Sequence, residues 1–209
     1  MLNLTKFKKI LFLLIFLTIF SFYFFEVDNV FTIQFLKENN ALLVKHINDN
    51  FISSIVFFYL IFFIFIFFFI PMTTIMVVFS SYLFGTLTTI FLSLLIVTSG
   101  GLSNIFLLKK LTFEKIFKKA ERFAKKIKTK IHGNEIQYLI LLRFIPMPFI
   151  IQNAIIVLLN TSRIKFIIST MLGVSPYIII YSLAGFKLKE LIQLLYFSLV
   201  NDNSSKTSF

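Results

Sequence analysis

Residues 137–160 of the chain read QYLILLRFIPMPFIIQNAIIVLLN, an apolar run interrupted by two prolines. An earlier run, IFFIFIFFFIPMTTIMVVFSSYLFG at residues 61–85, is interrupted in the same way at Pro71. Proline lacks a backbone donor and breaks a helix, so each run predicts two short helices joined by a break. In a membrane protein, interrupted apolar segments at matching places in two halves indicate a central polar site.

The distribution of charge predicts a membrane protein. Residues 50–108 contain no Asp, Glu, Lys, Arg or His. A bilayer core accommodates about 20 apolar helical residues, so this run is too long for one crossing, and a soluble protein could not bury it. We therefore predict a polytopic, all-α membrane protein. The chain has no cysteine and two widely separated histidines, so no metal site is expected.

Cations predict the orientation. Three lysines precede an apolar stretch at residues 10–25 that has no small-residue cleavage site, which predicts an N-terminal transmembrane anchor over residues 1–25. Residues 26–50 contain few cations, whereas residues 109–130 are rich in them. By the positive-inside rule, the N-terminus and the cation-rich segment are cytoplasmic and residues 26–50 form an external loop. The expected location is the plasma (inner) membrane.

The cation-rich segment has a one-sided apolar stripe. Its members are Phe113, Ile116, Phe117, Ala120, Phe123, Ala124, Ile127 and Ile131. This spacing predicts a basic amphipathic helix over residues 109–131. Such a helix binds an anionic leaflet; the alternative is a solvated helix that links two halves. Nucleic acid is not an expected partner despite the net charge of +12, because no aromatics interleave on the polar face.

Because residues 26–50 are expected outside and residues 109–130 in the cytoplasm, the chain must cross the membrane an odd number of times between residues 51 and 108. Three tight spans would satisfy this, and so would one re-entrant hairpin followed by one span. In the second scheme the hairpin turns near Pro71, ends near Gly85, and residues 86–108 cross. We favour it because the backbone freed near Pro71 must find partners away from lipid, and Thr73 and Thr74 lie nearby.

The second half repeats this pattern. Pro146 and Pro148 form the break, and Asn160 follows Pro146 by the same interval that separates Gly85 from Pro71. Gly and Asn both tolerate positive φ. Small residues follow each hairpin, at Gly100 and Gly173, and would allow close helix contact. We predict two inverted repeats, each a re-entrant helical hairpin plus a transmembrane helix, and a short helix with a polar tail over residues 187–209.

Arg143 is the principal candidate site residue. A cation at the centre of a membrane helix costs at least ~2.5 kcal/mol, so Arg143 either snorkels to the interface or binds an anion. No carboxylate lies in residues 50–108 or 136–187, which favours a lipid phosphate, a group that suits the planar donors of arginine. Other polar residues that could line the same cavity are Gln152, Asn153, Asn104, Thr73 and Thr74.

Residues 55–186 resemble the DedA superfamily, also called the VTT-domain or SNARE-associated Golgi protein family, and most closely its Tvp-like branch. The residues that carry the resemblance are the run Arg143–Pro148, Asn153, the run Thr170–Pro176, Gly185, and in the first half Pro71, Phe84, Gly85 and Gly100. The resemblance implies two re-entrant hairpins in inverted repeats. It also implies movement of phospholipids or polyprenyl-phosphate carriers between leaflets.

The chain departs from the family pattern in three ways. Phe149 stands where some relatives have a second arginine, and Val157 stands where a glycine is usual. The membrane-embedded acids that accompany proton coupling are missing. The resemblance therefore favours passive lipid movement over proton-driven transport. Hinge positions are expected at Pro71, Gly85, Gly100, Pro146, Pro148, Gly173 and Pro176.

We expect a lipid translocator or scramblase that acts on membrane lipids and contacts an anionic leaflet surface. Two alternatives stay open: a structural protein that organises the membrane through its basic helix, and a small-solute transporter. An enzyme and a cofactor are not expected, since no catalytic triad, metal cluster or phosphate-cradling glycine loop is present. A homo-oligomer is left open.

Overall fold

The computed structural model describes residues 45–111, 114–129 and 134–206, and all regular structure within them is helical. The elements from residue 51 onwards are α4 (Phe51–Phe67), α5 (Thr73–Phe84), α6 (Thr86–Leu111), α7 (Glu114–Lys128), α8 (Glu135–Phe144), α9 (Phe149–Leu158) and α10 (Arg163–Lys206). The all-α prediction is confirmed. The predicted anchor over residues 1–25 and most of the predicted external loop lie outside the described residues.

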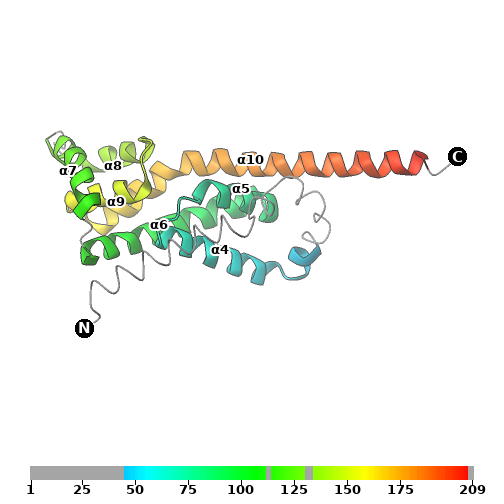
Figure 1. Ribbon diagram of the computed structural model, residues 1–209, viewed down its shortest axis with the longest axis horizontal. Coiled ribbons are helices and arrows are strands. Elements are labelled where there is room, and N and C mark those ends of the chain that lie inside the picture. Colours follow the sequence, from blue (N-terminus) through cyan, green and yellow to red (C-terminus); the bar gives the residue numbers. More distant parts are fainter. Residues whose placement is uncertain (1–44, 112–113, 130–133, 207–209) are drawn as a thin grey trace.

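The long helix α10 organises the others. It packs along α5, α6 and α8, while α4 lies on α6 and α7 lies on α9. Figure 1 shows α7, α8 and α9 gathered at one end of the molecule and α10 extending beyond the other helices towards the C-terminus. Two polypeptide halves, α4–α6 and α8–α10, are thus held together mainly through α10.

Helix lengths separate two classes of element. Within α6 and α10, the segments Thr86–Lys110 and Arg163–Leu194 are long and apolar enough to cross a membrane. By contrast, α5 has 12 residues and α9 has 10, so they extend only ~18 and ~15 Å, about half of a bilayer core. Neither α5 nor α9 is long enough to cross a membrane by itself.

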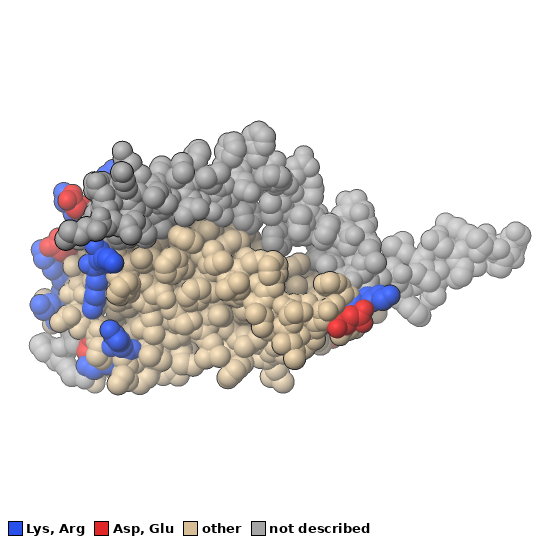
Figure 2. Space-filling view, turned by 90° about the horizontal axis from the view of Figure 1, so that it is seen from below, with Lys and Arg blue, Asp and Glu red and all other residues tan. Residues whose placement is uncertain are grey.

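One face of the described part of the molecule has a charge-free middle. Figure 2 shows Lys, Arg, Asp and Glu side chains at the two ends of the described part and none across the middle of this face. Large apolar side chains of the charge-free segment 50–108 are exposed: Leu87 is 84% exposed and Phe91 is 65% exposed. Lipid solvates such side chains well, whereas water would not.

Both predicted breaks are present. α4 ends before Pro71, and α8 ends before Pro146. After α4, Phe69 adopts φ +61°, and the N–H groups of Phe69 and Ile70 donate to the carbonyls of Ile66 and Phe65. This is a Schellman closure, and it satisfies carbonyls that lipid would otherwise leave unpaired.

The helices that follow the two breaks, α5 and α9, end at the two predicted turn residues. Asn160 adopts φ +55° and closes α9 with the same Schellman pattern, since the N–H groups of Asn160 and Thr161 donate to Val157 and Ile156. Gly85 ends α5 with φ +86° and ψ 164°, a backbone region that is essentially restricted to glycine. The prediction of positive φ at both positions is confirmed.

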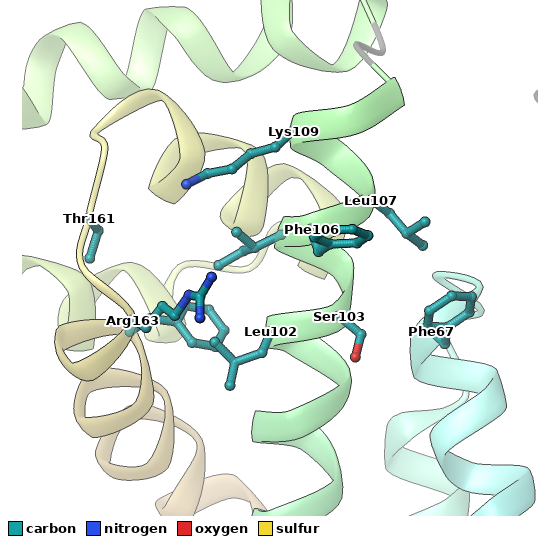
Figure 3. A pocket seen from close by; sticks show the side chains of 10 residues that line it. Phe67, Leu102, Ser103, Phe106, Leu107, Lys109, Thr161 and Arg163 are labelled. Atoms are coloured by element: carbon teal, nitrogen blue, oxygen red, sulfur yellow. The ribbon is translucent and has the colours of Figure 1, made fainter. Parts of the chain in front are cut away.

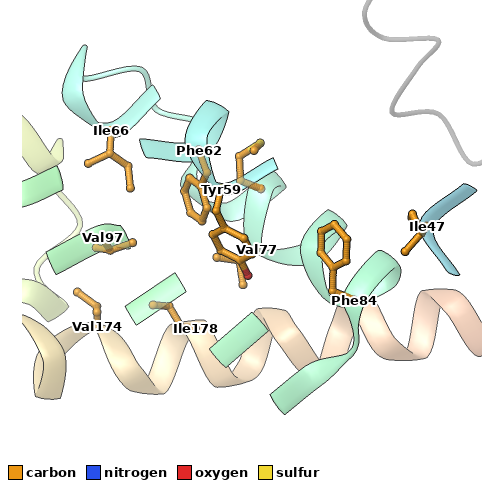
Figure 4. Close-up of a cluster of buried hydrophobic side chains, with 10 residues drawn as sticks. Ile47, Tyr59, Phe62, Ile66, Val77, Phe84, Val97, Val174 and Ile178 are labelled. Carbon is orange, nitrogen blue, oxygen red and sulfur yellow. The ribbon is translucent and has the colours of Figure 1, made fainter. Parts of the chain in front are cut away.

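The core of the first half lies between α4, α5, α6 and α10. Figure 4 shows Phe62, Val77, Val97 and Ile178 directed into this cluster from four different helices. Hydroxyls cross the same core: Tyr59 bonds Ser80 at 2.7 Å, and Ser80 bonds Thr89 at 2.9 Å. These bonds join α4, α5 and α6 without a charge.

The described residues of the basic segment belong to two helices, whereas the sequence predicts one helix over residues 109–131. Lys109 and Lys110 form the last turn of α6, and α7 covers Glu114–Lys128. The apolar face of α7, with Ala120 and Ala124 buried, packs on α9 in a second core cluster. Five described members of the stripe therefore pack inside the protein, namely Ile116, Phe117, Ala120, Ala124 and Ile127. Phe123 is 39% exposed and faces outward with the lysines of α7.

The C-terminal residues also differ from expectation. Instead of a separate short helix over residues 187–209, α10 continues from Arg163 to Lys206. Pro176 lies inside α10 and does not end it. The Ser175 hydroxyl donates to the Leu172 carbonyl at 3.0 Å, which is the carbonyl that proline leaves without its usual N–H partner.

An ion pair joins the start of α8 to the start of α10. Lys165 of α10 contacts the Glu135 carboxylate at the start of α8, and the Thr161 hydroxyl donates to the same carboxylate. The hydrogen bond from Lys165 is the main reason that the pKa of Glu135 is lowered, and burial opposes that shift. Glu135 therefore stays ionised at neutral pH and holds α8 beside α10.

Replacing Gly85 by alanine should destabilise the protein by ~1–3 kcal/mol, because the backbone at this turn disfavours any Cβ, even though space is free around it. Asn160→Gly is the control, since glycine adopts φ +55° readily, and its effect should stay below ~1 kcal/mol. Denaturant unfolding in detergent micelles measures both. Equal losses for the two variants would contradict this account of Gly85.

Candidate functional site

Arg143 lies in the last turn of α8 and is 6% exposed. The helix ends one residue later, at Phe144, because Pro146 disfavours helical backbone in the residue before it, and Ile145 is extended with ψ 126°. The snorkelling alternative is not what the structure shows, since the guanidinium is held inside the protein.

Neutral groups receive the hydrogen bonds of the guanidinium. Nη1 donates to the side-chain oxygens of Gln152 and Asn153 at 3.0 and 3.1 Å. Nη2 donates to Asn153 at 3.1 Å and to the Thr170 hydroxyl at 2.8 Å. These partners satisfy the N–H groups of Nη1 and Nη2, whereas the buried Nε has no hydrogen-bond partner among the described residues. No described carboxylate pairs with the guanidinium, a costly arrangement in a low-dielectric interior.

Two aromatic rings complete the surroundings of the cation. The guanidinium carbon lies 4.7 Å from the ring centre of Phe149 and 5.3 Å from that of Phe166. Cation–π contact stabilises a desolvated guanidinium by ~2 kcal/mol. Phe149 therefore supports Arg143 through its ring.

Close approach of α10 fixes the stem of Arg143. A Cβ at Gly173 would lie 2.7 Å from both Cβ and Cγ of Arg143, so only glycine permits this packing. A Cβ at Gly100 would similarly lie 2.6 Å from Ile66 at the end of α4. The predicted close contacts at small residues are confirmed, and both glycines lie within uninterrupted helices.

The two proline breaks meet at one cavity. It has a volume of about 430 Å³ and is open at the surface, which is sufficient for a polar head group. Its lining includes Pro71 from the first half, Pro146 and Pro148 from the second, and Arg143. None of the described residues that line it is acidic. We call it the central cavity.

Two helices begin at the central cavity. α5 starts at Thr73 and α9 starts at Phe149, both lining residues, and neither helix has a side-chain N-cap. Helix N-termini carry partial positive charge and free N–H groups. Together with Arg143, they make the cavity a favourable place for an anion.

Most predicted site residues come together here. The central cavity is lined by Arg143 together with Thr73, Thr74 and Gln152. Asn153 does not line it but accepts hydrogen bonds from Arg143. Asn104 does not line it: its amide donates to the Ile66 carbonyl at 3.1 Å and ties the first break to α6. Asn104 therefore supports the hairpin instead of a ligand.

Sequence reasoning missed the contribution of α10 to the site. Thr170 binds Arg143, and Val174, Tyr177 and Tyr181 line the central cavity. With Gly173, these residues follow the i, i+3, i+4, i+7 spacing of one helix face. That periodicity is visible in the sequence and predicts that these residues share one face of a helix.

No group of three or more His, Asp or Glu side chains that could bind a metal occurs among the described residues. The arrangement is suited to holding an anion by a fixed cation and helix N-termini. The described residues that line the cavity include no carboxylate and no histidine.

Residues 70–187 match the family model described as the VTT domain. The match covers more than half of the chain and includes Pro71, Arg143 and nearly the whole lining of the central cavity. No curated protein and no solved structure matches the chain.

Replacing Asn153 by leucine should destabilise the protein by more than ~2 kcal/mol, because two hydrogen bonds to a buried cation are lost. In an Arg143→Met background the same change should cost under ~1 kcal/mol, since the cation is gone. Denaturant unfolding of the four proteins in micelles gives the coupling energy. A cost independent of Arg143 would show that Asn153 acts through packing alone.

Proposed function

The chain belongs to the VTT-domain family, and from this premise we propose that it moves a phosphate-bearing lipid between the leaflets of a membrane. Family membership and its two long apolar helices make it an integral membrane protein. We further propose that it belongs to the Tvp-like branch and acts without an enzymatic step.

We propose that α4–α5 and α8–α9 are re-entrant hairpins in two inverted repeats. The lengths of α5 and α9 support this, because neither reaches across a bilayer core. The shared cavity supports it as well: irregular backbone at membrane depth is tolerated where it lines a polar cavity, and both breaks line the same one.

The single observation that carries the proposal is the buried charge of Arg143 at that cavity, which no described carboxylate compensates. A lipid phosphate would supply the missing negative charge, and the N-termini of α5 and α9 would add to its binding. The acyl chains would stay in the surrounding lipid while the head group passes the cavity. A phospholipid and a polyprenyl phosphate present the same group to Arg143.

A second candidate is organisation of the membrane through α7. The exposed lysines of α7, among them Lys118, Lys119, Lys125 and Lys126, favour contact with an anionic surface. Against insertion of α7 into the leaflet, its apolar face already packs on α9. We therefore rank this candidate below lipid movement.

Transport can be measured in liposomes that contain a fluorescent phospholipid, with dithionite reducing the label in the outer leaflet. The wild-type protein should make nearly all label reducible, and Arg143→Met should slow this at least about tenfold, equivalent to ~1.4 kcal/mol, because the phosphate loses its cation. A parallel assay with a labelled polyprenyl phosphate distinguishes the two substrates.

The matched control is Lys187→Gln, which removes an exposed cation that pairs with Glu190 away from the central cavity; its rate should equal that of wild type. Neutralising the four α7 lysines together should also leave the rate unchanged. If wild type moves no lipid, or Arg143→Met moves it equally fast while remaining folded, lipid movement through this cavity is wrong.

We also propose that the end of the molecule formed by α7 faces the cytoplasm, because the cations of α6 and α7 gather there. Since the chain has no cysteine, Lys119→Cys and Lys187→Cys are single reporters. In intact cells, an impermeant maleimide should label position 187 and leave position 119 unlabelled. The reverse pattern would invert the orientation.

A further inference from the structure

A second cavity lies between α6, the end of α4 and the start of α10. Its volume is about 480 Å³. Its walls are mainly apolar and include Phe67, Leu102, Phe106 and Phe166. Figure 3 shows it as a space bounded on one side by α6 and on the other by the connection from α9 to α10. We call it the lateral groove.

Two cations stand at one end of the lateral groove. Figure 3 shows the Lys109 amino group and the Arg163 guanidinium directed into the space from α6 and from the start of α10. Both residues are exposed, and among the described residues neither forms an ion pair. The nearby carboxylate of Glu135 is already engaged by Lys165.

The position of the cations indicates what the lateral groove accommodates. Lys109 lies at the end of the apolar segment Thr86–Lys110, and Arg163 lies at the start of the apolar segment Arg163–Leu194. Both therefore lie where membrane-spanning helices reach the head groups. The apolar walls at Leu102 and Phe106 continue from that level along α6 towards the acyl chains.

We propose that the lateral groove binds one anionic glycerophospholipid of the surrounding bilayer. The lipid phosphate lies between Lys109 and Arg163, and an acyl chain lies along Leu102 and Phe106. The charge is complementary, because the described residues that line the groove include two cations and no acidic residue. This site goes beyond the proposed function, because it binds lipid whether or not the protein moves lipid across the membrane.

The lateral groove is separate from the central cavity but adjacent to it. Phe166 is the shared wall: its ring lines the groove, and its ring centre lies 5.3 Å from the guanidinium carbon of Arg143. A lipid in the groove is thus one aromatic side chain away from the fixed cation. The two sites take the same chemical group but use different cations.

The experiment uses the absence of tryptophan from the chain. Leu102→Trp places a fluorescent reporter in the lateral groove, and Leu87→Trp places one on an open lipid-facing surface that is 84% exposed. The full chain is reconstituted in phosphatidylcholine liposomes with a minor fraction of brominated lipid. Brominated phosphatidylglycerol should quench the Leu102→Trp reporter at least about threefold more strongly than brominated phosphatidylcholine does, and both lipids should quench Leu87→Trp equally.

Neutralisation of the two cations tests the head-group contact. Lys109→Gln with Arg163→Gln, in the Leu102→Trp protein, should abolish the preference for phosphatidylglycerol. The charge-retaining pair Lys109→Arg with Arg163→Lys should keep it, and so should the control Lys118→Gln with Lys119→Gln, which removes two exposed cations from α7.

Three results would overturn the proposal. Equal quenching by both lipids would remove the anionic specificity. A preference that survives neutralisation of Lys109 and Arg163 would place the head group elsewhere. Absence of quenching by either lipid would show that another segment of this chain, or a second copy, fills the lateral groove.

Discussion

The structure depends on one constraint: backbone that leaves a helix inside a bilayer must be bonded by the protein itself. At the first break, the Schellman closure at Phe69 and the Asn104 amide satisfy carbonyls at the end of α4. At the second break, the Gln152 amide donates to the carbonyls of Ile145 and Met147. Asn104 and Gln152 are thus fixed by the helix breaks, and Gln152 is then available to bind Arg143 as well.

The residues that surround Arg143 therefore also hold the helices together. Gln152 connects the broken backbone to the guanidinium, and Gly173 allows α10 to approach close enough for Thr170 to accept from it. Phe149 begins α9 and also covers the guanidinium. A change in any of these residues acts on hairpin geometry and on the charge at the same time, which is why stability and transport must be measured together.

Much of this arrangement could be predicted from the sequence. Proline and the charge-free runs predict the breaks and the membrane class, and Gly85 and Asn160 predict turns with positive φ, because these features act locally. The role of Asn104, the use of the α7 stripe against α9 and the continuity of α10 past Pro176 could not be predicted, because each depends on which helix lies opposite. An amphipathic stripe is the same whether lipid or a protein helix covers it.

The protein groups that contact Arg143 also bear on how the proposed lipid movement would be driven. Among the described residues, Arg143 contacts neutral oxygens and aromatic faces, and none that lines the central cavity is acidic. A phosphate that binds there gains charge compensation without displacing a carboxylate, so its release needs no protonation of such a group. Binding and release would then follow the lipid gradient alone. For the proposed lipid movement, the described residues at this cavity therefore favour a passive process over a proton-coupled one.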